Sequence, residues 1–313
     1  MLSCLRAGDG AVLRRGRPRP SVAGAPRKCP RAWGWLATSL ATLALTAAAH
    51  GAQPVPQGNS SATARKAAMR ELPLDKIDEA DRQRVIEVLK HTSVYRRLPT
   101  QVMRCDPELF QFVIDHPEVM ANIWQLLGIE DIQLHRTSPT TFDADDGEGT
   151  RGQVEVLHRT HDTCLVYAGG SYDGPLFSQP ITGNCVLMLR TAYSREPDGF
   201  YYITTRLDVF VQLNHVGLDF LAKTFQPLVC RVADYNFVAT CGFIETLSQT
   251  AESNGPGLAR LATRLETVAP EVRDEFILVT ERVAARARER DGVARVEPPV
   301  RRAGYQEGQP RSR

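Results

Sequence analysis

The sequence lacks the short patterns that most often indicate catalysis or metal binding. It contains no C-x-x-C pair, no H-x-x-x-H or H-E-x-x-H spacing, and no glycine-rich loop that leads from a strand into a helix. The glycines around Ser171 and Tyr172 are followed by no helical pattern, so they form neither a nucleophile elbow nor a phosphate loop. We therefore expect no metal and no cofactor.

The sequence also has little net charge, +2 over 313 residues. Residues 1–33 carry eight basic side chains and one acid, which is +7 of that total and leaves −5 for the rest of the chain. A general nucleic-acid binder needs a basic face that displaces counterions from phosphate. A mildly acidic body excludes that class, so no nucleic-acid partner is expected.

Cysteines are few and cannot all be paired. Two of the seven precede residue 52, which leaves Cys105, Cys164, Cys185, Cys230 and Cys241. Cys230 and Cys241 fall in one predicted helix and lie about 16 Å apart at about 1.5 Å per residue, too far for a disulfide. A disulfide between Cys164 and Cys185 and buried free thiols both remain open.

Both ends of the chain differ in composition from a folded domain. The basic residues 1–33 precede an uncharged run from Trp33 to Ala52, as in a signal peptide cleaved after Ala49 or Gly51. The same run, residues 33–52, could stay as a membrane anchor. We expect export to the periplasm or secretion, a flexible linker over residues 53–71, and a disordered basic tail over residues 291–313. Residues 72–290 then form one domain.

The first part of this domain is predicted to be helical around a short extended segment. Apolar spacing predicts a helix over residues 75–91, and residues 95–104 favour a strand. Asp106 and Pro107 are typical of a helix start, and a second helix follows from His116-Pro117 until Gly128.

The middle of the domain has the pattern of an antiparallel sheet, in which short apolar runs alternate with turn residues. In the last run, Leu207, Val209 and Val211 alternate with Arg206 and Asp208, so they lie on opposite faces. Residues 164–167 and 185–189 are apolar on both faces, so we expect the N-terminal helix or a second subunit to cover the outer face. Strands are predicted over residues 131–136, 140–144, 152–158, 163–168, 183–192 and 200–213.

The longest helical pattern follows these strands, from residue 218 to about residue 250. Pro227 is expected to kink it near Thr224, and residues 253–257 are expected to end it. Two more helices are predicted over residues 258–268 and 272–288. The apolar positions predicted to share one face of the long helix include Leu221, Phe225, Leu228, Val232 and Tyr235.

This order of elements resembles the START-like or helix-grip superfamily, which includes lipid-transfer domains, polyketide cyclase-like proteins and the birch-pollen allergen group. The resemblance covers residues 95–250 and is carried by PELFQFVIDHPEVMANIWQLLG, GNCVLMLRTAY, GFYYITTRLDVFVQL and HVGLDFLAKTFQPLVCRVADYNFVATCGFIETL. The segment is also similar to exported proteins of planctomycete-type bacteria that have no assigned activity. The resemblance implies an α+β fold in which six or seven antiparallel strands wrap around the long helix, with a cavity between them. It supplies no catalytic motif, and the helices after Ser253 depart from the usual ending.

Three classes of function remain open. We favour an extracytoplasmic module that binds an apolar or amphipathic, lipid-like molecule without catalysis, because no activated nucleophile is visible. The alternative is a cyclase- or hydrolase-like enzyme that uses Asp208, His215 or Tyr235 at the cavity mouth, although a buried Arg206–Asp208 pair would be structural. The third is a cell-envelope interaction protein without a ligand. A homo-oligomer is also open. The residues expected to bind the ligand are Leu207, Val209, Val211, Leu221, Phe225, Leu228, Val232 and Tyr235.

Overall fold

The computed structural model describes residues 57–174, 180–214 and 218–296, apart from the side chains of residues 218–226, 228 and 293–296. All of these residues belong to one compact unit, Val55–Arg313. The predicted export signal lies outside the described residues. Within the described part, no helix is both long enough and apolar enough to cross a membrane.

One antiparallel sheet contains the eight strands of the described residues, in the order β1-β8-β7-β6-β5-β4-β3, with β2 also paired to β8. Each predicted strand is present, and the extended segment 95–104 forms two short strands along β8. Leu98 to Thr100 separate them, and Pro99, which has no N–H to donate, lies in this gap. The bounds are β1 (Val94–Arg97), β2 (Gln101–Arg104), β3 (Gln133–Arg136), β4 (Thr141–Asp145), β5 (Thr150–Arg159), β6 (Thr163–Tyr172), β7 (Ile181–Arg195) and β8 (Tyr201–Leu213).

Two helix ends, at Asp106 and Gly128, have the capping residues that the sequence predicts. The Asp106 carboxylate accepts hydrogen bonds from the backbone N–H groups of Glu108 (2.9 Å) and Leu109 (3.3 Å), and Gly128 ends the next helix with φ of 65°. The bounds are α2 (Ala62–Glu71), a 3-10 turn η1 (Leu74–Lys76), α3 (Glu79–Lys90), α4 (Pro107–Asp115), α5 (Pro117–Leu127), α6 (Leu218–Ala262) and α7 (Pro270–Val296).

The long helix α6 changes direction at Asn254, where the backbone is non-helical (φ −142°, ψ 49°). The Asn254 side chain caps the following segment, because its Oδ1 accepts a hydrogen bond from Gly257 N at 3.1 Å. Pro256 falls in the first turn of that segment, where its missing N–H costs nothing. The predicted break at residues 253–257 is therefore confirmed. Pro227, in contrast, lies inside α6 without interrupting it.

Helices α2 and α3 cover one side of the sheet, as expected of an N-terminal helical layer. Their side chains form one apolar core with Leu165, Val186, Met188 and Phe210. This packing contradicts the prediction of a flexible linker over residues 53–71, because α2 lies within it and Ala64 and Ala68 are buried. Alanines give no apolar periodicity, so the sequence pattern did not reveal a face that packs closely.

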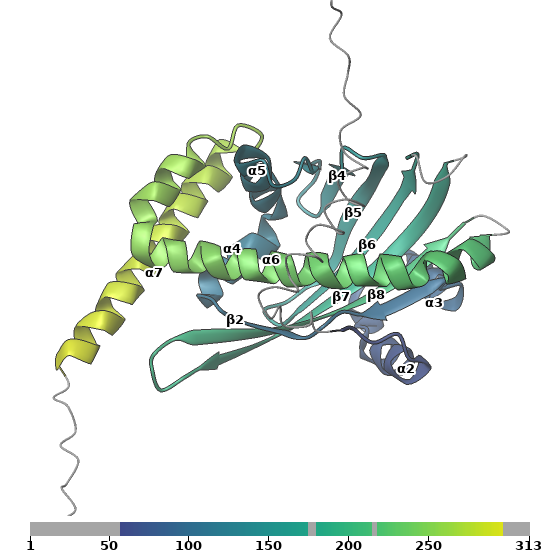
Figure 1. The fold of residues 1–313 in the computed structure, drawn as a ribbon, viewed down its shortest axis with the longest axis horizontal. Helices are drawn as coiled ribbons and strands as arrows, with labels where there is room; N and C mark the ends of the chain where they lie inside the picture. Colours follow the sequence, from purple (N-terminus) through teal and green to yellow (C-terminus); the bar gives the residue numbers. More distant parts are fainter. Residues whose placement is uncertain (1–56, 175–179, 215–217, 297–313) are drawn as a thin grey trace, which may run out of the picture. The chain divides into compact units, whose positions relative to one another are not determined.

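A second core joins the C-terminal helices to the rest of the fold. This core buries Phe110 and Phe112 of α4 and Ile123 of α5 against α6 and α7. The ring of Phe276 in α7 stacks on that of Phe112, with 5.5 Å between the ring centroids. The helices after Ser253 thus complete the domain (Figure 1). Since α7 runs to Val296, it enters the predicted disordered tail, whose remaining residues lie outside the described part.

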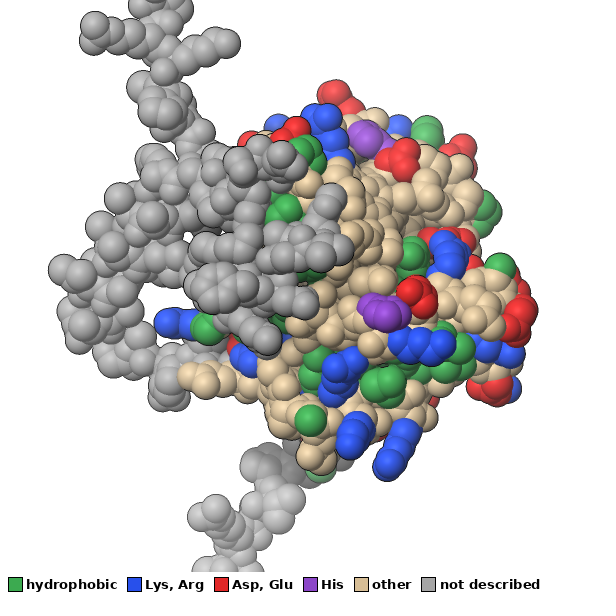
Figure 2. Space-filling model, turned by 90° about the vertical axis from the view of Figure 1, so that its right-hand side faces the viewer, with side chains coloured by type: hydrophobic (Ala, Val, Ile, Leu, Met, Phe, Trp, Pro, Cys, Tyr) green, Lys and Arg blue, Asp and Glu red, His purple; other side chains and the backbone are tan. Residues whose placement is uncertain are grey.

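The surface in Figure 2 carries basic, acidic and hydrophobic side chains that are interspersed. Within the described residues, this face therefore has no extended patch of one charge sign.

We predict that Ala68→Asp lowers the free energy of unfolding by about 2 kcal/mol or more, because it buries a carboxylate in the α2–α3 core. Ala68 is 2% exposed, whereas Ala62 in the first turn of the same helix is exposed. The control Ala62→Asp should therefore not lower the free energy of unfolding, because an acid is favourable at a helix N-terminus. Urea unfolding followed by circular dichroism measures both. Equal stability of the two variants would mean that α2 is a free segment.

Candidate functional site

The side of the sheet that faces α6 is apolar. Residues paired directly across antiparallel strands lie on the same side, and the register places Val209 beside Leu187, and Leu187 beside Val166. Thr205 lies on this side too and contacts Cys241 of α6 (Oγ1 to Sγ, 3.7 Å). The α6-facing side contains Val154, Val156, Cys164, Val166, Ala168, Cys185, Leu187, Leu189, Leu207, Val209 and Val211.

The two sides of the sheet differ in burial. Toward α2 and α3, Leu165, Val186 and Phe210 are 0% exposed, so this side is closed. On the α6-facing side, Met103, Phe142, Cys164 and Ile203 are buried. The apolar residues of the central strands, such as Leu187 and Val209, are half-buried. Among the described residues, the sheet thus has one apolar side that α2 and α3 fill and one whose central apolar residues stay half-buried.

A row of glycines crosses the same side near the ends of the strands. Gly152 pairs with Gly170, and Gly170 pairs with Gly183. A Cβ at Gly152 or Gly170 would lie 2.5 Å from a backbone oxygen of the neighbouring strand, and a Cβ at Gly183 would lie 2.7 Å from one. Glycine is therefore required for the strands to approach this closely, as at a bend in a curved sheet.

A buried ion pair fastens α6 to the edge of the sheet. Asp234 of α6 is 3% exposed and accepts hydrogen bonds from Arg96 Nε (3.0 Å) and Arg96 Nη2. Its second oxygen also accepts a hydrogen bond from Gly58 N at 3.0 Å. Sequence reasoning missed this pair. The feature that could have revealed it is Asp234 itself, an acid on the same helical face as Cys230 and Cys241.

The predicted ligand-binding residues divide into three groups. Leu207, Val209 and Val211 of β8 lie on the α6-facing side, as predicted. Val232 and Tyr235 do not face the sheet, because they are 38% and 55% exposed. The side chains of Leu221, Phe225 and Leu228, and the whole of His215, lie outside the described residues.

Asp208 lies on the opposite side, away from α6. It is 1% exposed, and its carboxylate accepts hydrogen bonds from Tyr95 Oη (2.6 Å) and from Arg97 Nε (2.8 Å) and Nη2 (3.2 Å). Arg206 Nε adds an ion pair at 3.5 Å. Burial, and then the hydrogen bond to Asp208, raise the pKa of Tyr95, so the phenol stays protonated. The structure therefore contradicts a place at a cavity mouth for Asp208 and supports the structural alternative.

Two thiols of the sheet, those of Cys164 and Cys185, lie on the α6-facing side. Burial raises the pKa of Cys164 to about 11 and that of Cys185 to about 12. Cys164, at 8% exposed, is the more buried residue. Both thiols are thus protonated at neutral pH and are poor nucleophiles. They are also unbridged, because Cys164 pairs with Leu189 and Cys185 with Ala168, which places them about 13 Å apart along the strands.

Among the described residues, no group of three or more His, Cys, Asp or Glu side chains could hold a metal ion.

Comparisons with known proteins identify no family for this chain. No family model matches the sequence. No curated protein matches it either. Among solved structures, the chain is similar to the di-domain ARO/CYC BexL from the BE-7585A biosynthetic pathway, with 14% sequence identity and a TM-score of 0.33. The match covers 59% of this chain and 58% of that one, so the chain spans little more than half of this relative. Such a distant likeness does not indicate a shared activity.

We predict that Asp208→Asn lowers the free energy of unfolding by about 2 to 3 kcal/mol, because Arg97 loses its charged partner in a mostly buried site. The matched control is Asp145→Asn, which removes the exposed Asp145–Arg151 pair and should have little effect. Chemical unfolding at neutral pH compares them. A stable Asp208→Asn protein would return Asp208 to the functional candidates.

We also predict a loss of stability at alkaline pH from the buried thiols. A raised pKa in the folded state stabilises the protein fully below the pKa of the unfolded thiol, about 8.5, and this contribution is lost as the pH rises toward the folded value, about 11 for Cys164. In Cys164→Ala, the decline in unfolding free energy above pH 8.5 should be shallower by up to about 1.4 kcal/mol per pH unit. Urea unfolding under reducing conditions between pH 8 and pH 10.5 measures the slope; parallel curves would refute the assignment.

Proposed function

We propose that this chain is a non-catalytic binding module that holds an apolar or amphipathic, lipid-like small molecule between the sheet and α6. The single observation that carries the proposal is the difference between the two sides of the sheet. Among the described residues, Leu165, Val186 and Phe210 on the α2–α3 side are fully buried, whereas the aliphatic residues in the centre of the α6-facing side are half-buried. Covering apolar surface contributes about 25 cal/mol per Å2, so a molecule that completes the α6-facing side gains affinity from surface that the chain leaves open.

The chemistry of this side favours binding over catalysis. Its described side chains on the central strands are aliphatic, apart from Thr191, Thr205 and thiols that burial keeps protonated. The acid that the sequence offered as a catalyst, Asp208, is buried on the other side and its oxygens are already hydrogen-bonded. A site with few polar groups selects a ligand by shape and apolar area.

The attachment of α6 supports this role. The Arg96–Asp234 pair and the Thr205–Cys241 contact hold the helix at the β1–β2 edge of the sheet. A buried charge pair of this kind fixes one geometry, because displacement of either partner would leave the other charge desolvated and unpaired. The helix can thus be positioned over the sheet without aliphatic packing along its whole length.

We propose further that the module is exported and works in the periplasm or outside the cell. The basic residues 1–33 and the apolar run at residues 33–52 support this location. The same run could act as an anchor if it is not cleaved.

We predict that the purified protein carries a stoichiometric apolar adduct, detected by native mass spectrometry and identified after organic extraction. Leu187→Asn and Val209→Asn should each weaken rebinding of the extracted molecule about tenfold or more, because they place an amide on the apolar surface.

The control is Val232→Asn, which alters an exposed valine on the outer side of α6 and should leave binding unchanged. Two outcomes would contradict the proposal. One is a folded protein that neither carries an adduct nor binds fatty acids saturably; the other is equal binding by all three variants.

A further inference from the structure

A polar pocket lies at the other end of the sheet, between α5 and the edge strand β3. Its volume is about 260 Å3, which corresponds to about nine water molecules at about 30 Å3 each. Helix α5 contributes Glu118, Asn122 and Gln125, which recur at the spacing of one helical face. The rest of the lining is Ala121, Gln133, Leu134, His135 and Thr267.

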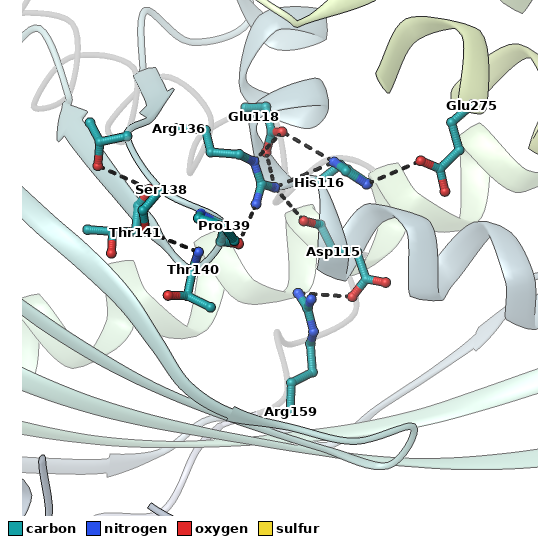
Figure 3. Close-up of polar contacts among 11 residues, drawn as sticks. Asp115, His116, Glu118, Arg136, Ser138, Pro139, Thr140, Thr141, Arg159 and Glu275 are labelled. Atoms are coloured by element: carbon teal, nitrogen blue, oxygen red, sulfur yellow. Dashed lines mark hydrogen bonds and ion pairs between the residues drawn. The ribbon is translucent and has the colours of Figure 1, made fainter. Parts of the chain in front are cut away.

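The charged residue of this pocket, Glu118, is neutralised within the protein. Arg136 donates to both carboxylate oxygens, from Nε at 2.9 Å and from Nη2 at 3.0 Å. Figure 3 shows the same guanidinium directed toward the backbone carbonyls of Asp115 and Pro139, and His116 between Glu118 and Glu275. Burial alone raises the pKa of Glu118, but hydrogen bonds with His116 and Arg136 lower it overall, so the pair is ionised and carries no net charge.

The remaining polar side chains of the pocket have unused hydrogen-bonding capacity. Asn122 is 7% exposed, and its Nδ2 donates to Gln125 Oε1 at 3.0 Å, while its Oδ1 is buried without a partner. Rotating both amides exchanges donor and acceptor but still leaves one Asn122 atom unpaired. Gln133, His135 and Thr267 make no side-chain hydrogen bond within the described residues. An unpaired buried amide is unfavourable, and a bound group that satisfies it removes that cost.

We propose that this pocket is a binding site for a small neutral polyol of monosaccharide size. A hydroxyl group both donates and accepts, so it can pair with Asn122 in either amide orientation and with the glutamine amides. Charged ligands are disfavoured because the Glu118–Arg136 pair leaves no net charge to attract them. The lining contains no Phe, Tyr or Trp ring on which a sugar could stack, so the ligand is held by hydrogen bonds, with an expected Kd of about 1 mM.

The site is independent of the apolar side of the sheet. Its residues come from α5, from β3 and from the segment that joins α6 to α7. Leu134 lies on the α6-facing side by register, but at the edge of the sheet opposite β1. Gln133, His135 and Thr267 are exposed, so a ligand can enter directly from solvent. Failure of either proposal leaves the other unaffected.

The test is a titration of the 15N-labelled protein with myo-inositol and with glucose, followed through the side-chain amide signals of Asn122, Gln125 and Gln133. We expect saturable shifts in all three signals. Asn122→Leu and Gln133→Ala should each weaken binding about tenfold. Gln133 is exposed, so its variant tests the site without a risk to folding. The matched control is Asn236→Ala, an exposed amide on α6, which should bind as the wild type does.

Glucosamine and glucuronate serve as charged comparators and are expected to bind more weakly than the neutral probes. Tighter binding of either one would overturn the neutral class of ligand. The absence of a saturable shift with all four probes would overturn the site and leave a pocket that holds water alone. Shifts that persist in both pocket variants would place the binding elsewhere.

Discussion

Two adjacent arginines on the edge strand β1 make buried ion pairs on the two sides of the sheet, one with helix α6 and one with strand β8. Successive residues of a strand point to opposite sides, so Arg96 reaches Asp234 of α6 while Arg97 reaches Asp208 on the α2–α3 side. Both acids are almost fully buried. Because an unpaired buried charge is costly, the Arg96 pair fixes the position of α6 and the Arg97 pair fixes the register of β1 on β8. A shift of β1 by one residue would break both pairs at once.

This arrangement explains how a sheet can be apolar on both sides and yet be filled on only one. The α2–α3 layer packs with small and branched side chains, including Ala68 and Val85, directly onto Val186 and Phe210. On the other side, α6 is fixed through polar contacts at the edge, such as the one between Arg96 and Asp234. The aliphatic residues of the central strands beyond these contacts stay half-buried.

The strands could be predicted well from the sequence because alternation and turn residues are local features of the chain. Alternation in residues 200–213 sets both faces of β8, and turn residues bound the other strands. The buried face of α6 was harder to predict, because apolar residues lie on all sides of this part of the helix. Of these, Val232 and Tyr235 are exposed, whereas Cys230 is buried. The buried residue that decides the orientation is an acid, Asp234, and an apolar stripe cannot reveal it. Helix α2 was missed because alanine burial depends on close packing, which has no periodic signal of its own.

The polar pocket has no sequence signature because three separate segments form it. The spacing of Glu118, Asn122 and Gln125 reads as the solvated face of a short amphipathic helix, and Gln133 reads as part of an exposed edge strand. Arg136 makes this face part of a pocket, because it neutralises the Glu118 charge and binds β3 to the α4–α5 junction. Thr267 lines the pocket from the segment before α7. The C-terminal part of the chain therefore contributes to the polar pocket as well as to the second core.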